Sequence, residues 1–157
     1  MTRNVLVTGG SSGIGLETAR SYLEDGEQVV ICGSTADKLA AALDELREIG
    51  EVTGAVVDVR DQDAVEELVD EDGPFDVVIA SAGICEQARL GDVDSDDVWH
   101  RTMNINVDGV YYTLKAVADD MPDGGNMIVV SSGLGKNARA AYEAYTASKH
   151  AVLGLMK

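Results

Sequence analysis

Three side chains near the carboxyl-terminal end of the sequence have the types and spacing of an acid–base group. Ser132 lies thirteen residues before Tyr145, and Lys149 lies four residues after it. Four residues make about one helical turn, so Tyr145 and Lys149 share a face of any helix that carries both. An ammonium beside a phenol favours the phenolate, so the pair can give or take a proton. The spacing therefore indicates a ready acid–base pair.

A glycine-rich segment near the other end has the composition of a phosphate-binding loop. It runs from Thr8 to Gly15 and reads Thr-Gly-Gly-Ser-Ser-Gly-Ile-Gly. Glycine lets the backbone turn sharply and approach a ligand closely. The helix expected next offers free N–H groups and a partial positive charge at its amino end. A tight turn without a ligand is the alternative. The segment is suited to holding a pyrophosphate, and with the acid–base pair it indicates hydride chemistry on a carbonyl or an alcohol.

The elements expected around these motifs alternate between strands and helices. Short apolar runs predict strands at residues 4–8, 28–32, 52–57, 75–80 and 126–130. Helical spacing and glycine or proline stops predict helices at residues 14–25, 36–49, 62–71, 96–120 and 142–157. In the first helix, the side chains expected to face inward are Ile14, Ala19, Tyr22 and Leu23. The alternation predicts an α/β fold, a doubly wound parallel sheet of the Rossmann type, with ligands at the carboxyl ends of the strands.

Charge and composition narrow the possible partners. The chain of 157 residues is 45% hydrophobic and carries a net charge of −16, from 28 acidic and 12 basic residues. We expect one domain over residues 1–157, and neither nucleic acid nor a membrane as a partner, because anionic surfaces repel this charge. The acidic side chains repel one another in dilute buffer, and salt screens that repulsion. We therefore hypothesise that the protein comes from a high-salt, halophilic cytoplasm. An ordinarily acidic protein is the alternative.

The cysteines and the amino terminus indicate the compartment. Cys32 and Cys85 are too few for a disulfide framework, and each follows an apolar run, so we expect two buried thiols. Met1 to Arg3 lead directly into a strand, which predicts no signal peptide. We therefore expect a cytoplasmic protein, and the sequence contains no cluster of metal-ligand residues.

The glycine-rich segment departs from Gly-x-Gly-x-x-Gly and matches the Thr-Gly-x-x-x-Gly-x-Gly loop of the short-chain dehydrogenase/reductase family. From Val5 to Lys157 the chain resembles the amino-terminal two thirds of a member of that family. The resemblance implies that the carboxy-terminal strands of the fold are missing, and that the domain is truncated after the helix carrying Tyr145 and Lys149. It also implies a homo-oligomer and leaves the fifth strand as an exposed edge.

The resemblance implies roles for four catalytic residues. Tyr145 gives a proton to the carbonyl oxygen or takes one from the alcohol, and Lys149 holds the nicotinamide ribose. Ser132 hydrogen-bonds the substrate oxygen, with Ser131 as its possible substitute. Asn106 matches the residue that anchors a water in the proton relay. Asn104 is the rival for that role, but the Val-x-Gly that follows selects Asn106.

The resemblance also implies a set of cofactor-binding residues. They are Thr8, Gly9, Ser11, Ser12, Gly13, Ile14 and Gly15 of the glycine-rich segment, Gly33, Ser34 and Thr35, Asp58 and Val59, Ser81, Ala82 and Gly83, and again Tyr145 and Lys149. Ser81 stands where the family has asparagine.

The end of the second strand bears on the choice of nicotinamide cofactor. No carboxylate stands there to bind a ribose 2′-OH, whereas Ser34 and Thr35 can donate to a 2′-phosphate and Lys38 adds charge. The arginine that many NADP-using relatives carry at the Ser34 or Ser12 position is absent. NADP(H) is favoured over NAD(H), and helix capping remains the alternative for Ser34 and Thr35.

The sequence therefore predicts an NAD(P)(H)-dependent oxidoreductase that interconverts a carbonyl and a secondary alcohol in a small-molecule substrate. The alternative is a dinucleotide-binding module, or a truncated fragment with little or no turnover. An epimerase or dehydratase on the same scaffold is a third reading, against which the complete set of Asn106, Ser132, Tyr145 and Lys149 argues.

Overall fold

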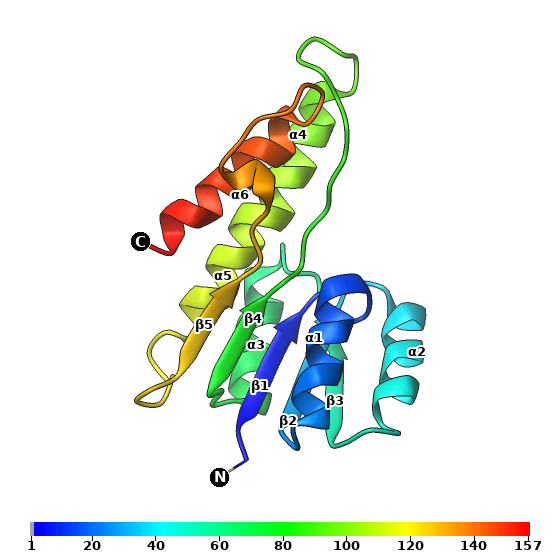
Figure 1. Cartoon of the computed structure of the whole chain (residues 1–157), viewed down its shortest axis with the longest axis vertical. Coiled ribbons are helices and arrows are strands. Elements are labelled where there is room, and N and C mark those ends of the chain that lie inside the picture. The colour runs from blue at the N-terminus through cyan, green and yellow to red at the C-terminus, as the bar shows by residue number, and fades with distance from the viewer. Residues whose placement is uncertain (1) are drawn as a thin grey trace.

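The computed structural model describes residues 2–157 and is built around one parallel sheet of five strands (Figure 1). The strands are β1 (Asn4–Thr8), β2 (Gln28–Gly33), β3 (Val52–Val56), β4 (Val77–Ala80) and β5 (Asn126–Val129). Their order across the sheet is β3-β2-β1-β4-β5, and every neighbouring pair is parallel. The predicted doubly wound α/β fold is confirmed, with β5 at one edge.

Helices cover both faces of the sheet. They are α1 (Gly13–Glu24), α2 (Ala36–Leu46), α3 (Gln62–Asp72), α4 (Ser95–Met103), α5 (Gly109–Val117) and α6 (Glu143–Leu155). Helices α1 and α2 pack on one face and α3 and α5 on the other, while α6 lies along α4 (Figure 1). Within residues 2–157 no helix is both long and apolar enough to cross a bilayer.

The side chains of each strand alternate between the two faces of the sheet and so contribute to two hydrophobic cores. Val5 and Val7 of β1 pack toward α1 and α2, whereas Leu6 between them packs toward α3 and α5. Successive side chains of a strand point to opposite faces, so a doubly covered strand is apolar throughout. All three of these side chains are fully buried. The sheet is thus a rigid floor for whatever its carboxyl ends hold.

The predicted long helix over residues 96–120 is interrupted, which corrects the sequence-based expectation. A π-helical turn, η1 (Asn104–Asp108), separates α4 from α5, and α5 ends at Val117 rather than near residue 120. The π turn coincides with Asn106, whose side chain is fully buried and bonded to Ile84. Such turns often occur at functional sites. Helical periodicity in the sequence cannot reveal one extra residue in a turn.

Two expectations about burial were wrong. Ile14 was expected to face inward, but its side chain is 65% exposed, because the first turn of α1 projects beyond the sheet. Cys85 was expected to be a buried thiol and is exposed, since it lies in the loop after β4 and not in the strand. Cys32 is buried as expected, and burial raises the pKa of its thiol to about 12.

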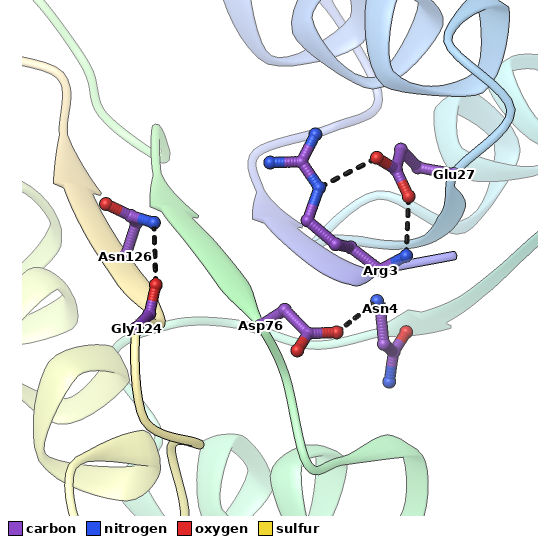
Figure 2. A network of polar contacts seen from close by, with 6 residues as sticks. All are labelled: Arg3, Asn4, Glu27, Asp76, Gly124 and Asn126. Atoms are coloured by element: carbon purple, nitrogen blue, oxygen red, sulfur yellow. Dashed lines mark hydrogen bonds and ion pairs between the residues drawn. The ribbon is translucent and has the colours of Figure 1, made fainter. Parts of the chain in front are cut away.

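The amino ends of the strands are joined by polar contacts of their own (Figure 2). The backbone N–H of Asn4 donates to Asp76 over 2.8 Å, and the guanidinium of Arg3 pairs with Glu27 over 2.7 Å. These contacts occupy the charged groups at this end of the sheet. The carboxyl ends, in contrast, leave room for a ligand.

Candidate active site

A crevice of about 540 Å³ opens at the carboxyl ends of the strands. Among the residues that line it are sixteen predicted from the sequence: Gly9, Ser11, Ser12, Gly13, Ile14, Gly15, Gly33, Ser34, Thr35, Asp58, Val59, Ser81, Ala82, Gly83, Tyr145 and Lys149. Three predicted residues, Thr8, Asn106 and Ser132, lie outside this lining. The glycine-rich segment and the acid–base pair thus share one crevice, although more than 120 residues separate them in sequence.

The glycine-rich segment is shaped by close backbone contacts. Gly9 and Gly13 have φ of +68° and +55°, a region that side chains disfavour. A Cβ on Gly15 would lie 2.4 Å from the carbonyl oxygen of Gly9. Ser12 caps α1 without a side-chain hydrogen bond, which leaves the amino end of the helix open to an anion. The segment therefore has the backbone form of a phosphate site.

Thr8 supports the segment from behind. Its hydroxyl oxygen lies 3.2 and 3.3 Å from the backbone nitrogens of Ser81 and Ala82, which donate to it. The side chain is buried and joins the loop after β1 to the loop after β4. Thr8 therefore fixes the shape of the crevice without lining it.

The end of the crevice above β2 and β3 carries two cations. Lys38 and Arg60 line it together with Ser34 and Thr35. Thr35 occupies the N-cap position of α2 but makes no side-chain capping bond, so its hydroxyl is not committed to the helix. Arg60 pairs with Asp58 over 2.5 Å and lowers the pKa of that carboxyl. This end combines hydroxyl donors with positive charge.

The opposite end holds the acid–base pair. Lys149 is 5% exposed, and its ammonium donates to the carbonyl oxygen of Val130 over 2.8 Å. The same ammonium lies 5.7 Å from the centroid of the Tyr145 ring. Burial lowers the pKa of Lys149, and the nearby thiol of Cys85 acts in the opposite direction. Tyr145 and Lys149 both line the crevice, and they share a face of α6 as their spacing predicted.

Asn106 lies behind that pair and is fully committed to the protein. Its side-chain oxygen accepts from the backbone of Ile84 over 2.8 Å, and its NH₂ donates to the carbonyl of Ile84 over 2.9 Å. The second amide hydrogen reaches the hydroxyl of Ser148 over 3.0 Å. The side chain of Asn106 therefore anchors the loop after β4 to α6. Asn104, the rival candidate, is exposed on the same π turn.

The two serines after β5 differ in their surroundings. Ser131 lines the crevice, and its hydroxyl donates to the carbonyl of Lys149 over 3.2 Å. Ser132 begins the short 3₁₀ turn η2 (Gly133–Gly135), and its hydroxyl accepts from the backbone of Leu134 over 3.2 Å. A hydroxyl that accepts this bond keeps its own hydrogen free to donate. The catalytic role of Ser132 remains a prediction.

Comparison with known proteins decides the family. A family model described as short chain dehydrogenase matches residues 3–157. The chain belongs to this family. The 3beta-hydroxysteroid dehydrogenase 2 of Eggerthella lenta is 38% identical over 164 residues, covering 99% of this chain and 63% of that protein.

Solved structures of similar proteins have the same fold. A blue fluorescent protein from a metagenomic library, in complex with NADPH, superposes with a TM-score of 0.89 at 34% identity, covering 98% of this chain and 65% of that one. A short chain dehydrogenase/reductase of Burkholderia phymatum, in complex with NAD, gives 0.92 at 26% identity, with coverage of 98% and 57%. The chain spans 48% to 63% of the length of three curated family relatives.

Several lining residues were not among those predicted from the family motifs. They are Lys38, Val57, Arg60, Ile84, Cys85, Ile105, Val130 and Ser131. Val57, Val130 and Ser131 directly follow a strand, and Arg60, Ile84 and Cys85 lie in the loops after β3 and β4, so the rule that ligands bind at carboxyl ends could have found these six. The sequence had already singled out Lys38 for its charge and Ser131 as the possible substitute for Ser132. Ile105 had no such signal, because the π turn that places it is invisible in the sequence.

Proposed function

We propose that the chain is a single dinucleotide-binding domain that holds NADP(H) or NAD(H) along the crevice. The phosphates lie at the glycine-rich segment, the adenosine end near Asp58 and the nicotinamide end near Tyr145 and Lys149. One observation carries the proposal: the glycine-rich segment and the phenol–ammonium pair line the same crevice. The NADPH and NAD in two structures of similar proteins support it.

The residues present fit such a cofactor. Close backbone packing around Gly9 and Gly15 leaves no side chain between the loop and a pyrophosphate. The open amino end of α1 favours negative charge. At the other end, the buried ammonium of Lys149 can donate to the ribose hydroxyls with the hydrogens that Val130 does not use.

The chemistry proposed is interconversion of a carbonyl and a secondary alcohol. A bound nicotinamide supplies or accepts the hydride. Tyr145 gives a proton to the carbonyl oxygen in reduction and takes one in oxidation, while the Lys149 ammonium favours the phenolate. Ser132 donates to the substrate oxygen, and Asn106 anchors a water in the proton relay. The names of relatives such as gluconate 5-dehydrogenase of Gluconobacter oxydans support this reaction class.

NADP(H) is the preferred cofactor in this proposal. Ser34, Thr35 and Lys38 line the adenosine end, and the nearby carboxylate of Asp58 is already paired with Arg60. A 2′-phosphate there meets hydroxyl donors and a free ammonium rather than a free carboxylate. Calorimetry should give a lower Kd for NADPH than for NADH. Equal or reversed affinities would contradict the preference.

We further propose a cytoplasmic homo-oligomer adapted to high salt. The edge strand β5 leaves backbone groups for pairing. The net charge of −16 repels itself in dilute buffer, and salt screens that repulsion. The melting temperature should rise with molar KCl, and a flat or falling curve would contradict the adaptation to high salt. Sedimentation should give an oligomer, and a monomer would contradict the proposed homo-oligomer.

The decisive experiment is turnover of a carbonyl panel, followed at 340 nm with NADPH. Tyr145→Phe should lower kcat by about 10³-fold, in the usual range for a proton-transfer group, while the Kd of NADPH stays unchanged. Tyr111→Phe is the matched control, since Tyr111 is exposed and does not line the crevice. Tight NADPH binding without turnover, unaffected by Tyr145→Phe, would favour the binding module or fragment. Absence of binding would contradict the proposal.

A further inference from the structure

The charge of the crevice is opposite in sign to that of the chain, whose net charge is −16. Within residues 2–157, the charged side chains that line the crevice are three cations and one carboxylate: Lys38, Arg60, Lys149 and Asp58. Lys149 lies at the proposed nicotinamide end, and the other three lie at the adenosine end. Because the adenosine of NAD(H) is uncharged, two cations at this end indicate a ligand that carries a further anionic group there.

Strand pairing places the loop that carries Arg60 beside the end of β2. Strands β2 and β3 are parallel neighbours, and the backbone N–H of Val57 donates to the carbonyl of Gly33 over 3.2 Å. Neighbouring strands lie about 4.8 Å apart, so Ser34 and Asp58 leave the sheet side by side. The adenosine end of the crevice therefore forms where these two loops meet.

Arg60 is held in this place by its contacts to Asp58. The Nε atom of Arg60 lies 3.0 Å from each carboxylate oxygen, and its Nη2 lies 2.5 Å from Oδ2. The backbone N–H of Arg60 also donates to Oδ1 over 3.0 Å. These contacts restrain a side chain that is about half exposed, so the guanidinium is already positioned before a ligand binds.

The guanidinium of Arg60 keeps donors for a second partner. The contacts to Asp58 use the Nε hydrogen and one hydrogen of Nη2, which leaves both hydrogens of Nη1 and one of Nη2. Two such parallel N–H groups match the oxygens of a phosphate. Lys38, in the first turn of α2, has no carboxylate within 4.0 Å among residues 2–157 and adds a second positive charge.

We propose that Arg60, oriented by Asp58, binds the 2′-phosphate of NADP(H) and thereby determines the choice of coenzyme, with Lys38 as the second cation. The inference rests on the proposed function, because that function places the adenosine at this end of the crevice. Arg60 is the one arginine that lines the crevice within residues 2–157, and Ser34 and Ser12 supply no positive charge.

The test is the ratio of the Kd of NADH to the Kd of NADPH, measured by calorimetry at one ionic strength. Arg60→Gln should lower this ratio at least about fivefold, the upper range for one exposed ion pair, by weakening NADPH and leaving NADH unchanged. A role of Arg60 in the shape of the loop alone would weaken both coenzymes equally. An unchanged ratio, or binding of NADH alone by the parent, would overturn the inference.

Two further comparisons exclude indirect effects of the lost charge. Arg47→Gln removes the same charge from an exposed site at the end of α2, and its ratio should stay at the parent value. Arg60→Gln also leaves Asp58 without its ion pair, so the substitution is repeated in Asp58→Asn, where it should still lower the ratio. An equal fall in Arg47→Gln, or no fall in the Asp58→Asn background, would overturn the assignment to Arg60.

The two proposals fail separately. Absence of binding of both coenzymes, or turnover indifferent to Tyr145→Phe, counts against the proposed function whatever the effect of Arg60. Normal binding and turnover with a ratio that does not depend on Arg60 counts against the further inference alone.

Discussion

The two ends of the crevice are built in opposite ways. The glycine-rich end is made of backbone, and a Cβ on Gly9, Gly10 or Gly15 would meet another atom at 2.4–2.8 Å. The other end is made of side chains, with Asn106 and Lys149 each held by hydrogen bonds to loop carbonyls. The first end therefore loses its shape when an atom is added, whereas the second loses contacts to a ligand when a polar group is removed.

The largest expected effect is on the side-chain end. Asn106→Ala removes three hydrogen bonds and leaves the N–H and carbonyl of Ile84 without these partners. The free energy of unfolding should fall by about 3 kcal/mol, because two partly buried backbone groups and the buried hydroxyl of Ser148 lose their partner. Urea unfolding measures it. Asn104→Ala is the control on the same π turn and should change stability by less than about 0.5 kcal/mol. Equal losses in both variants would contradict the claim that the hydrogen bonds of Asn106 stabilise the fold.

The matching change at the backbone end is Gly15→Ala. The new Cβ would lie 2.4 Å from the carbonyl oxygen of Gly9, so the loop must move. We expect a loss of about 2 kcal/mol in stability and a more than tenfold weaker Kd for NADPH. Gly154→Ala, in α6, meets nothing within 4 Å and should stabilise slightly. An unchanged Kd for NADPH in Gly15→Ala would contradict the claim that close backbone contacts shape the glycine-rich end.

The smallest expected effect on stability is that of Lys149→Met. Burial lowers the pKa of Lys149 in the folded state, so keeping its charge opposes folding at neutral pH. The variant should be at least as stable as the parent, within about 0.5 kcal/mol.

The pH dependence sharpens this prediction. As pH rises from 7 through the lowered pKa of Lys149, the folded state releases the proton while the unfolded chain still binds it. The free energy of unfolding therefore rises with pH because of this residue. The free energy of unfolding of the parent, relative to that of Lys149→Met, should therefore increase between pH 7 and 10 in parallel urea titrations. A relative decrease as pH rises would contradict a buried, charged ammonium at Lys149.

The strands, the sheet and the phosphate-binding shape could be predicted because each depends on local pattern. Continuous apolar runs such as Val5 to Val7 mark doubly covered strands, and only glycine tolerates the contacts at Gly15. The pairing of Tyr145 with Lys149 followed from helical spacing alone.

What escaped prediction depends on packing between distant segments. The π turn at Asn106 forms where its side chain meets Ile84, and no periodicity signals that contact. The exposure of Cys85 and Ile14 depends on where each element ends relative to the sheet. The bridge between Ala88 and Tyr142 joins two loops without any motif.

The central claim is that both ends of the crevice bind one coenzyme, and calorimetry with two ligands tests it most directly. NADPH reaches both ends, whereas adenosine 2′,5′-bisphosphate reaches only the glycine-rich and adenosine end. Gly15→Ala should weaken both ligands, and Lys149→Met should weaken NADPH about tenfold while leaving the bisphosphate unchanged. If Lys149→Met binds NADPH as tightly as the parent does, the two ends do not share a ligand and the account is wrong.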